Sequence, residues 1–356
     1  MTSASHPRGD VGTRFLVCAA SFVILIAGIR FAASLVQPFL VAVFLAVVNI
    51  PLMNWLQGRR LPKPLAVLCT ILMAVSIIGV LVAVVSQSVT QLAGLDPDAY
   101  LESLRELARP VIAFADRLDL PIGQWQSALA PSLAQVPGVV GNALRAVGSL
   151  LTSTLLVLLA VIFILFEAAG FGAKLKVAFG TEGDYFGQLS RITTQVQNYL
   201  VIKMAISAAT GVFIGVWVWL IGLEFPLLWG VLAFLFNFIP NLGSILAAVP
   251  AVLLAVIQPD LGAMSTALIV AGYLFINIVF GNFVEPLLMG RRLGLSTLVV
   301  FISLVFWGWV WGPVGMLFSV PLTMVVKIAL ENTTDFRWVA VLLGANPPVT
   351  QPRAQP

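Results

Sequence analysis

The sequence predicts an all-α polytopic membrane protein with about six full transmembrane helices and two re-entrant helical hairpins in its C-terminal half. Of its 356 residues, 60% are hydrophobic and only 10% are charged, and the mean hydropathy is +1.04. A soluble core could not bury that proportion of apolar side chains. Lipid must therefore be the solvent for most of the chain. Uninterrupted apolar runs predict the transmembrane helices, and interrupted ones predict the hairpins.

Six apolar runs approach or exceed the roughly 20 residues that span about 30 Å of hydrocarbon as an α-helix. In this conformation every backbone N–H and C=O group bonds within its own segment. The runs are Phe15–Leu35, Phe39–Trp55, Leu65–Val85, Leu150–Phe166, Leu200–Ile221 and Gly262–Val284. The first run is longer than a signal-peptide core, so we expect an uncleaved anchor, joined to the second run by a link near Gln37 and Pro38.

Basic residues recur after every second crossing, as the positive-inside rule requires of cytoplasmic loops. They are Arg59, Arg60, Lys63, Lys174, Lys176, Arg191, Lys203, Arg291 and Arg292. The rule predicts a cytoplasmic N-terminus. Lys203 lies about one turn inside its apolar run, from where its side chain can snorkel to the cytoplasmic interface. Because the charges are spread over short loops and do not form one patch, no nucleic-acid partner is expected.

The chain divides into five parts. Residues 1–90 hold the N-terminal tail and the first three spans, and residues 91–148 form an extracytoplasmic segment with the apolar spacing of amphipathic helices. We interpret that segment as a cap packed on the span ends, with a partner-binding site as the alternative. Residues 149–224 hold spans four and five with a cytoplasmic amphipathic linker. Residues 225–330 form a transport core of hairpin, span and hairpin, and residues 331–356 form a largely disordered cytoplasmic tail.

Two apolar stretches of the core, Phe225–Ile257 and Leu295–Val326, are too long for one crossing and are broken in the middle. A continuous helix of either length would measure roughly 48 Å, well beyond the bilayer core. The breaks are carried by glycine and proline, at Pro240 and Gly243 in the first stretch and at Gly312, Pro313 and Gly315 in the second. Broken segments on both sides of an intact span are the pattern of a transporter binding site. Counting crossings, the first hairpin enters from outside and the second from inside.

Polar side chains collect at these breaks. Asn237, Asn241 and Ser244 flank the first break, and Asn282 and Glu285 lie near the end of the following span. Amide and hydroxyl oxygens, together with the free carbonyls of a broken helix, can coordinate a small cation or the hydroxyls of a polar solute. We therefore expect Asn237, Asn241, Ser244 and Asn282 to bind the cargo. Glu285, three residues after Asn282 on the same helix face, is the candidate for coupling or gating.

Each of these assignments has a structural alternative. The asparagines of the first break could merely satisfy the backbone groups that Pro240 leaves unpaired. Glu285 could form an ion pair with Arg291 or Arg292 at the inner boundary.

The sequence carries no residue set of an intramembrane enzyme. Every aspartate falls in a loop or tail, and there is no GxSxG, HExxH or Walker A motif. The one histidine, His6, lies in the polar N-terminal tail, and Cys18 and Cys69 fall inside separate predicted spans. We therefore expect no enzyme, no metal and no cofactor, and an ATP-driven pump only if another subunit supplies the ATPase.

Several motifs of the transport core are specific enough to compare with a known family. They are Ile239-Pro240-Asn241-Leu242-Gly243-Ser244, Asn282-Phe283-Val284-Glu285-Pro286, Leu288-Met289-Gly290-Arg291-Arg292-Leu293-Gly294-Leu295-Ser296 and Gly312-Pro313-Val314-Gly315-Met316. In these motifs the chain resembles the autoinducer-2 exporter family of bacterial permeases, although Ser244 and Thr297 stand where that family commonly has proline. The resemblance implies an inner-membrane transporter that forms a homo-oligomer and exports the autoinducer-2 quorum-sensing signal or a related metabolite.

Residues and resemblance together predict a secondary transporter that exports a small polar solute, such as the autoinducer-2 signal, across the bacterial inner membrane. An alternative of the same class is a sodium or lithium to proton antiporter, which the resemblance also allows, with Glu285 as the carrier. An alternative of another class is a non-transporting membrane scaffold whose outer helices at 91–148 bind a partner. The expected partners are the lipid bilayer, a small-molecule or monovalent-cation cargo and further copies of the chain.

Overall fold

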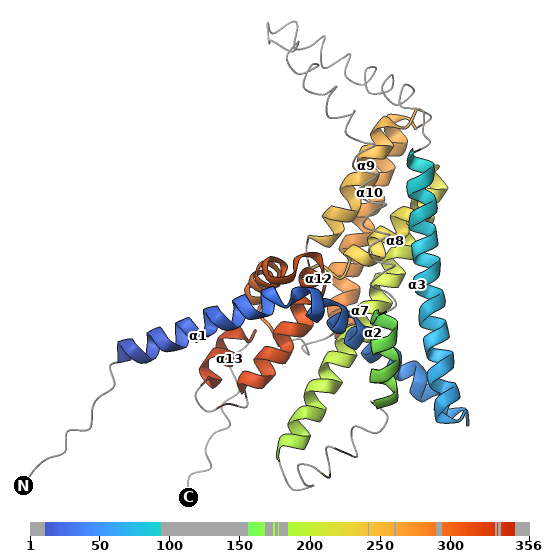
Figure 1. Cartoon of the computed structure of the whole chain (residues 1–356). Helices are drawn as coiled ribbons and strands as arrows, with labels where there is room; N and C mark the ends of the chain where they lie inside the picture. The colour runs from blue at the N-terminus through green and yellow to red at the C-terminus, as the bar shows by residue number, and fades with distance from the viewer. Residues whose placement is uncertain are drawn as a thin grey trace, which may run out of the picture.

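The computed structural model describes residues 11–93, 156–167, 174, 177, 184–240, 242–259, 261–289, 294–331, 333 and 336–345 (Figure 1). Across these ranges the chain is helical apart from short links and one isolated β-bridge. By length and composition alone, five described helices could cross a membrane: Ala33–Gly58, Lys63–Ser88, Thr193–Ile221, Ala263–Met289 and Thr297–Glu331, of which the last is bent back on itself. The predicted all-α polytopic membrane protein is confirmed. The predicted outer segment lies outside the described residues from residue 94 onward.

The N-terminal helices meet at a different residue from the one expected. Helix α1 (Val11–Phe31) is separated from α2 (Ala33–Gly58) by Ala32 alone. The predicted link at Gln37 and Pro38 is wrong, because both residues lie inside α2. Proline withholds one N–H from the helix there, and the helix continues through it. Figure 1 shows α1 running at a steep angle to the long helix α3 (Lys63–Ala93).

Helix α7 (Asp184–Ile221) is the longest described helix, at 38 residues, and it packs against α8 (Pro226–Phe236) through glycines. A Cβ placed on Gly211 would lie 2.6 Å from the carbonyl oxygen of Gly230, and one placed on Gly230 would lie 2.8 Å from that of Gly211. Only residues without side chains allow backbones to approach so closely. The short helix Leu156–Glu167 is the described part of the predicted fourth span.

The first predicted hairpin is present. Its arms are α8 and α9 (Gly243–Ile257), and the chain reverses between them. A Cβ on Gly243 would collide with the carbonyl oxygen of Phe236, so the tip requires glycine. At the other end the Gln258 side chain donates to the carbonyl of Gly222 and accepts from the N–H of Glu224, both at 3.0 Å. The hairpin therefore begins and ends on the same side of the molecule.

A continuous helix leads from the first hairpin toward the second. It consists of α10 (Ala263–Ile278), a π-helical turn η1 (Val279–Val284) and α11 (Glu285–Met289). The N–H of Glu285 bonds to the carbonyl of Phe280, five residues earlier, which is the π pattern. Short π segments within α-helices occur frequently at functional sites.

The second predicted hairpin is folded within α12 (Thr297–Glu331), which reverses at Trp311 and Gly312. Gly312 has a φ of 62° and a ψ of −143°, a conformation that side chains disfavour. The Trp307 indole donates to the Thr323 hydroxyl at 3.0 Å, although the residues are 16 apart and would be roughly 24 Å apart along a straight helix. A Cβ on Gly315 would collide with the carbonyl oxygen of Trp307, so this tip is also closed by glycine.

The tip of the second hairpin is bound to the junction of α1 and α2. Gln37 donates its side-chain amide to the carbonyl of Trp311 at 3.0 Å, and the Trp311 indole donates to the carbonyl of Ile29 at 3.3 Å. The guanidinium of Arg30 lies 4.6 Å from the ring centre of Trp309. The Trp311 carbonyl at the break in α12 is thus satisfied by Gln37, a residue from the other end of the chain.

The C-terminal tail is more ordered than expected. Residues Arg337–Leu343 form a helix, α13, in which Ala340 is buried and packs beside α12. The N–H of Ser296 donates to the carbonyl of Leu343 at 3.1 Å, which ties the tail to the start of α12. The prediction of disorder is wrong for this stretch, because its apolar residues recur at helical spacing and reach the core. Residues 346–356 lie outside the described residues.

Candidate functional site

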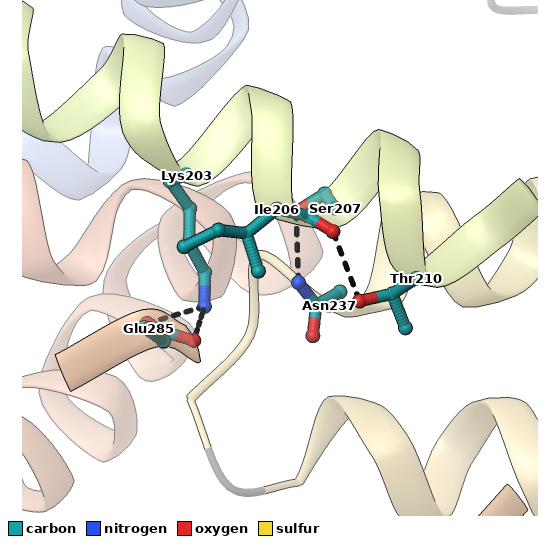
Figure 2. A network of polar contacts seen from close by, with 6 residues as sticks. All are labelled: Lys203, Ile206, Ser207, Thr210, Asn237 and Glu285. Carbon is teal, nitrogen blue, oxygen red and sulfur yellow. Dashed lines mark hydrogen bonds and ion pairs between the residues drawn. The ribbon is translucent and has the colours of Figure 1, made fainter. Parts of the chain in front are cut away.

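A polar stripe runs along one face of α7 at the level of the hairpins. Lys203, Ser207 and Thr210 follow one another at spacings of four and three residues, which places them on one side of the helix. All three are buried, with 4%, 0% and 1% of their surface exposed. Thr210 donates to the carbonyl of Ile206 within its own helix at 2.9 Å. The other two contact different elements (Figure 2).

Lys203 forms an ion pair with Glu285, the first residue of α11 (Figure 2). Its ammonium nitrogen Nζ lies 2.7 Å from Oε1 and 2.8 Å from Oε2 of the carboxylate. Among the ion pairs of the described residues this is the most deeply buried, with the lysine side chain 5% and the glutamate side chain 23% exposed. The structure therefore corrects the expectation that Lys203 snorkels to the interface, because the carboxylate gives its charge a partner inside the protein.

The predicted alternative partners of Glu285 lie outside the described residues, since neither Arg291 nor Arg292 is placed. The carboxylate is paired across 82 residues of sequence, with a lysine on another helix. The charge of Glu285 therefore has a partner without the pairing to Arg291 or Arg292 that the sequence suggested.

The tip of the first hairpin contacts the same face of α7. Asn237 lies directly after α8 and donates its side-chain amide to the hydroxyl oxygen of Ser207 at 2.9 Å (Figure 2). Among the described residues no donor is placed on the amide oxygen of Asn237. Ser244 is half-buried at the start of α9, and Asn241 lies outside the described residues. One of the three predicted residues of this tip is thus joined to α7 by a hydrogen bond.

Asn282 does not share its surroundings with Glu285. It lies in the π turn η1 and is exposed, whereas Glu285 is half-buried. The expectation of a shared face assumed α-helical spacing, and the wider π turn rotates the residues before Glu285 away from it. Asn277, one turn before η1, donates to the carbonyl of Tyr273 in its own helix at 2.8 Å.

The two hairpins approach each other across a single aromatic side chain. Phe44 of α2 makes edge contacts with Phe238 at the tip of the first hairpin, at 5.9 Å between ring centres, and with Phe318 in the second arm of α12, at 4.8 Å. Such pairs stabilise by about 0.5–1.5 kcal/mol beyond the area they bury. The hairpins that enter from opposite ends are thus bridged next to the polar stripe.

A separate hollow of about 730 Å³ lies between α3, α7 and α8. Its wall is made of apolar side chains and glycines and carries no charged group: Ile77, Leu81, Ala208, Gly211, Val212, Gly215, Val216, Trp219, Pro226, Leu227, Gly230, Val231 and Phe234. A polar solute would lose its hydrogen bonds to water there without replacement. We therefore place the candidate site at the polar stripe and not at this hollow.

The described residues contain no cluster of three or more histidine, cysteine, aspartate or glutamate side chains that could hold a metal ion. The polar groups of the stripe are one ion pair, amides and hydroxyls. These groups suit the binding and release of a small polar molecule or ion.

Comparison with known proteins decides the family. The sequence profile described as "AI-2E family transporter" matches residues 20–335, which is most of the chain. The chain belongs to the AI-2E transporter family. It is 38% identical to the "AI-2 transport protein TqsA" of Escherichia coli (strain K12) over 335 residues, which cover 94% of this chain and 96% of the relative.

Two further relatives of this AI-2E transporter carry only general names. It is 34% identical to the "Putative transport protein YhhT" of Escherichia coli (strain K12) over 345 residues, covering 96% of the chain and 97% of the relative. It is also 34% identical to a "Putative transport protein" of Haemophilus influenzae over 339 residues, covering 93% and 96%. The likeness to named transport proteins thus extends over nearly the full length of each.

Sequence reasoning missed two residues that the structure brings to the site, Lys203 and Ser207. A basic residue near the inner end of a span is common, so the sequence alone favours a topology signal at Lys203. An ionisable residue within an apolar run is also a functional candidate with a partner elsewhere, and that rule could have paired it with Glu285. Ser207 carries no sequence signal beyond its spacing of four from Lys203.

Proposed function

We propose that this AI-2E transporter is a secondary transporter of the bacterial inner membrane, with a cytoplasmic N-terminus, and that it exports a small polar solute. The observation that carries the proposal is the meeting of the broken helix at Asn237 and the Lys203–Glu285 pair on one buried face of α7. Polar groups at membrane depth are costly to keep and are typical of substrate pathways. The relative named as an AI-2 transport protein makes the autoinducer-2 signal the first candidate cargo.

In this proposal Asn237, Asn241, Ser244 and Asn282 bind the cargo, and Glu285 couples or gates its movement. The contact of Asn237 with Ser207 and the pairing of Glu285 support their two roles, since both residues join elements that are far apart in sequence. Asn241, Ser244 and Asn282 are included as polar groups beside the helix breaks. The chemistry is binding and release, without covalent catalysis, so we do not propose an enzyme.

Flux measurements test the proposal. Purified protein is placed in sealed liposomes that contain an internal pH dye and the autoinducer-2 signal, and a proton gradient is imposed. Efflux of the signal is compared with efflux from protein-free vesicles. Signal flux that is lost in Asn237→Ala and retained in Asn277→Ala supports the exporter. If the signal and a panel of small polar metabolites remain inside in every preparation, the transporter assignment loses its support.

The second candidate is a sodium or lithium to proton antiporter, which is favoured by the ion pair. A carboxylate at membrane depth is the group that carries protons and cations in such proteins. In the same liposomes, adding sodium or lithium would then change the internal pH, and Glu285→Gln would abolish that change. A silent dye with continued signal flux favours the exporter.

The proposal also includes a homo-oligomer, as the family resemblance implies. Chemical cross-linking in intact membranes, followed by denaturing electrophoresis, counts the subunits. A non-transporting scaffold would give no flux in the transport assay. Deleting residues 96–137 would abolish its partner binding, whereas Asn237→Ala would leave that binding unchanged.

A further inference from the structure

We propose that Lys203 is a tethered counter-cation, which occupies the Glu285 carboxylate when the site is empty and competes with a small monovalent cation for the same two oxygens. The inference rests on the proposed function, because it describes how the site of that transporter is regulated. It assigns a task to a residue that belongs to none of the predicted cargo-binding positions.

The geometry of the pair is that of an occupied cation site. A single ammonium nitrogen lies 2.7 Å and 2.8 Å from the two carboxylate oxygens, so both oxygens are already used. An entering cation cannot bind both oxygens until the ammonium has moved away. The interaction is charge-assisted and short, which makes it strong compared with neutral hydrogen bonds.

The exposure of the two side chains decides which kind of ion competes. The lysine side chain is 5% exposed, whereas the glutamate side chain is 23% exposed. A ligand that enters the site therefore meets the carboxylate first, and an anion has no comparable access to the ammonium. One turn along α7 from Lys203, the Ser207 hydroxyl accepts from the amide of Asn237, so a second polar contact lies on the same face of the helix (Figure 2).

Charge balance limits the competitor to one positive charge. The pair is neutral, and an unbalanced charge at this depth would be costly. When a monovalent cation replaces the ammonium, the carboxylate stays neutralised. The displaced lysine can then extend along its flexible stem toward the polar first part of α7, because Lys203 lies three residues after Leu200, where the apolar part of that helix starts. Lys203 thus has two favourable positions, one paired and one snorkelled.

Two substitutions move cation affinity in opposite directions. Lys203→Gln removes the tethered competitor, so the sodium or lithium concentration for half-saturation should fall by at least about tenfold. Lys203→Arg supplies a guanidinium that grips the carboxylate with two parallel hydrogen bonds, so the same concentration should rise. A residue with a purely structural role would weaken binding in both variants.

The measurement is equilibrium binding of radiolabelled sodium ions to full-length protein in detergent, with lithium as the competitor. Lys327→Gln is the matched control, since Lys327 pairs with Glu331 at 3.0 Å with half the glutamate exposed, and it should leave binding unchanged. Glu285→Gln should abolish binding. If Lys203→Gln fails to fold, the rise expected for Lys203→Arg still tests the inference.

The outcomes separate this inference from the proposed function. Opposite shifts in the two lysine variants support the tethered cation. Unchanged affinity in folded Lys203→Gln, or no sodium binding by the unmodified protein, overturns it. If solute flux persists in either of the last two cases, the transporter proposal stands without the competing lysine. If the unmodified protein shows neither flux nor binding, both ideas fail together.

Discussion

The Glu285 carboxylate and the Lys203 ammonium form a buried ion pair that joins α11 to α7. An acid beside a broken apolar segment stands out in a sequence with so few charges. Its pairing with Lys203 depends on how α10, η1 and α11 pack against α7, and no local pattern encodes a contact across 82 residues. The exposure of Asn282 escaped prediction for a related reason, because π turns carry no sequence signature that α-helical spacing rules can detect.

For the Lys203–Glu285 pair, we expect that neutralising one residue destabilises the protein more than neutralising both. Glu285→Gln leaves a buried ammonium without its counter-charge and should destabilise the folded protein by about 3 kcal/mol, the lower end of the range for buried pairs because the glutamate is partly exposed. The double variant Lys203→Gln, Glu285→Gln removes both charges and should recover most of that loss. Thermal unfolding in detergent measures both variants.

Glu331→Gln provides the comparison for that experiment. It breaks the Lys327–Glu331 pair at the end of α12, where the glutamate is half-exposed, and should cost less than about 1 kcal/mol. Equal losses for Glu285→Gln and Glu331→Gln would contradict the buried character of the first pair.

The asparagines provide a second matched comparison. Asn237→Ala removes the donor to a fully buried serine hydroxyl, which should destabilise the protein by about 1–3 kcal/mol and reduce transport at least tenfold. Asn277→Ala removes a bond within one helix and should leave transport within about twofold. Initial rates of solute flux, corrected for folded protein, measure the difference. Similar losses in both variants would remove Asn237 from the site.

Among the helices, the sequence predicted the two hairpin breaks correctly but misplaced the boundary between the first two helices. Both hairpins were visible because glycine and proline interrupt apolar stretches that are too long for one crossing. The joint between α1 and α2 was misplaced because the break falls at Ala32, which carries no such signal, while the visible proline lies inside α2. Helix α13 was missed because composition suggested disorder, whereas Ala340 and its neighbours pack beside α12.

The closed tips predict that a single methyl group opens a hairpin. Gly243→Ala and Gly315→Ala place a Cβ against the carbonyl oxygens of Phe236 and Trp307, so the two arms must separate. We expect lower yields of folded protein and a loss of transport beyond about tenfold. Gly79→Ala, which has no atom within 4 Å of the added carbon, should behave as the unmodified protein. Size-exclusion profiles and flux together report the result, and normal flux in both tip variants would mean that the arms can part without harm.

For the molecule as a whole, opposed hairpins require that both arms of each hairpin start from one end of the molecule, and that the two hairpins use opposite ends. Gln258 closes the open end of the first hairpin, and the contact of Ser296 with Leu343 lies at the open end of the second. Figure 1 shows the turn between α9 and α10 at one end of the molecule and the turn between α2 and α3 at the other. Which end faces the cytoplasm follows only from the basic residues of the sequence.

Cysteine labelling tests that orientation. With Cys18 and Cys69 replaced by alanine, single cysteines are introduced at Arg59, in the basic turn, and at Ala263, at the start of α10. In spheroplasts an impermeant maleimide should label Ala263→Cys directly and Arg59→Cys only after the membrane is permeabilised. The reverse pattern would place the N-terminus outside, and direct labelling of both would contradict their position on opposite sides.

The hydrogen bonds that link Gln37 and Ile29 to Trp311 have a consequence for the synthesis and membrane insertion of the protein. These contacts join residues 274 and 282 positions apart, so they cannot form until the ribosome has made nearly the whole chain. At about 5–20 residues per second, the first two helices wait in the membrane for on the order of tens of seconds before Trp311 arrives. During that interval the amide of Gln37 needs another acceptor, such as a lipid headgroup or an insertion factor. The last hairpin to enter the membrane therefore completes the environment of the first helices.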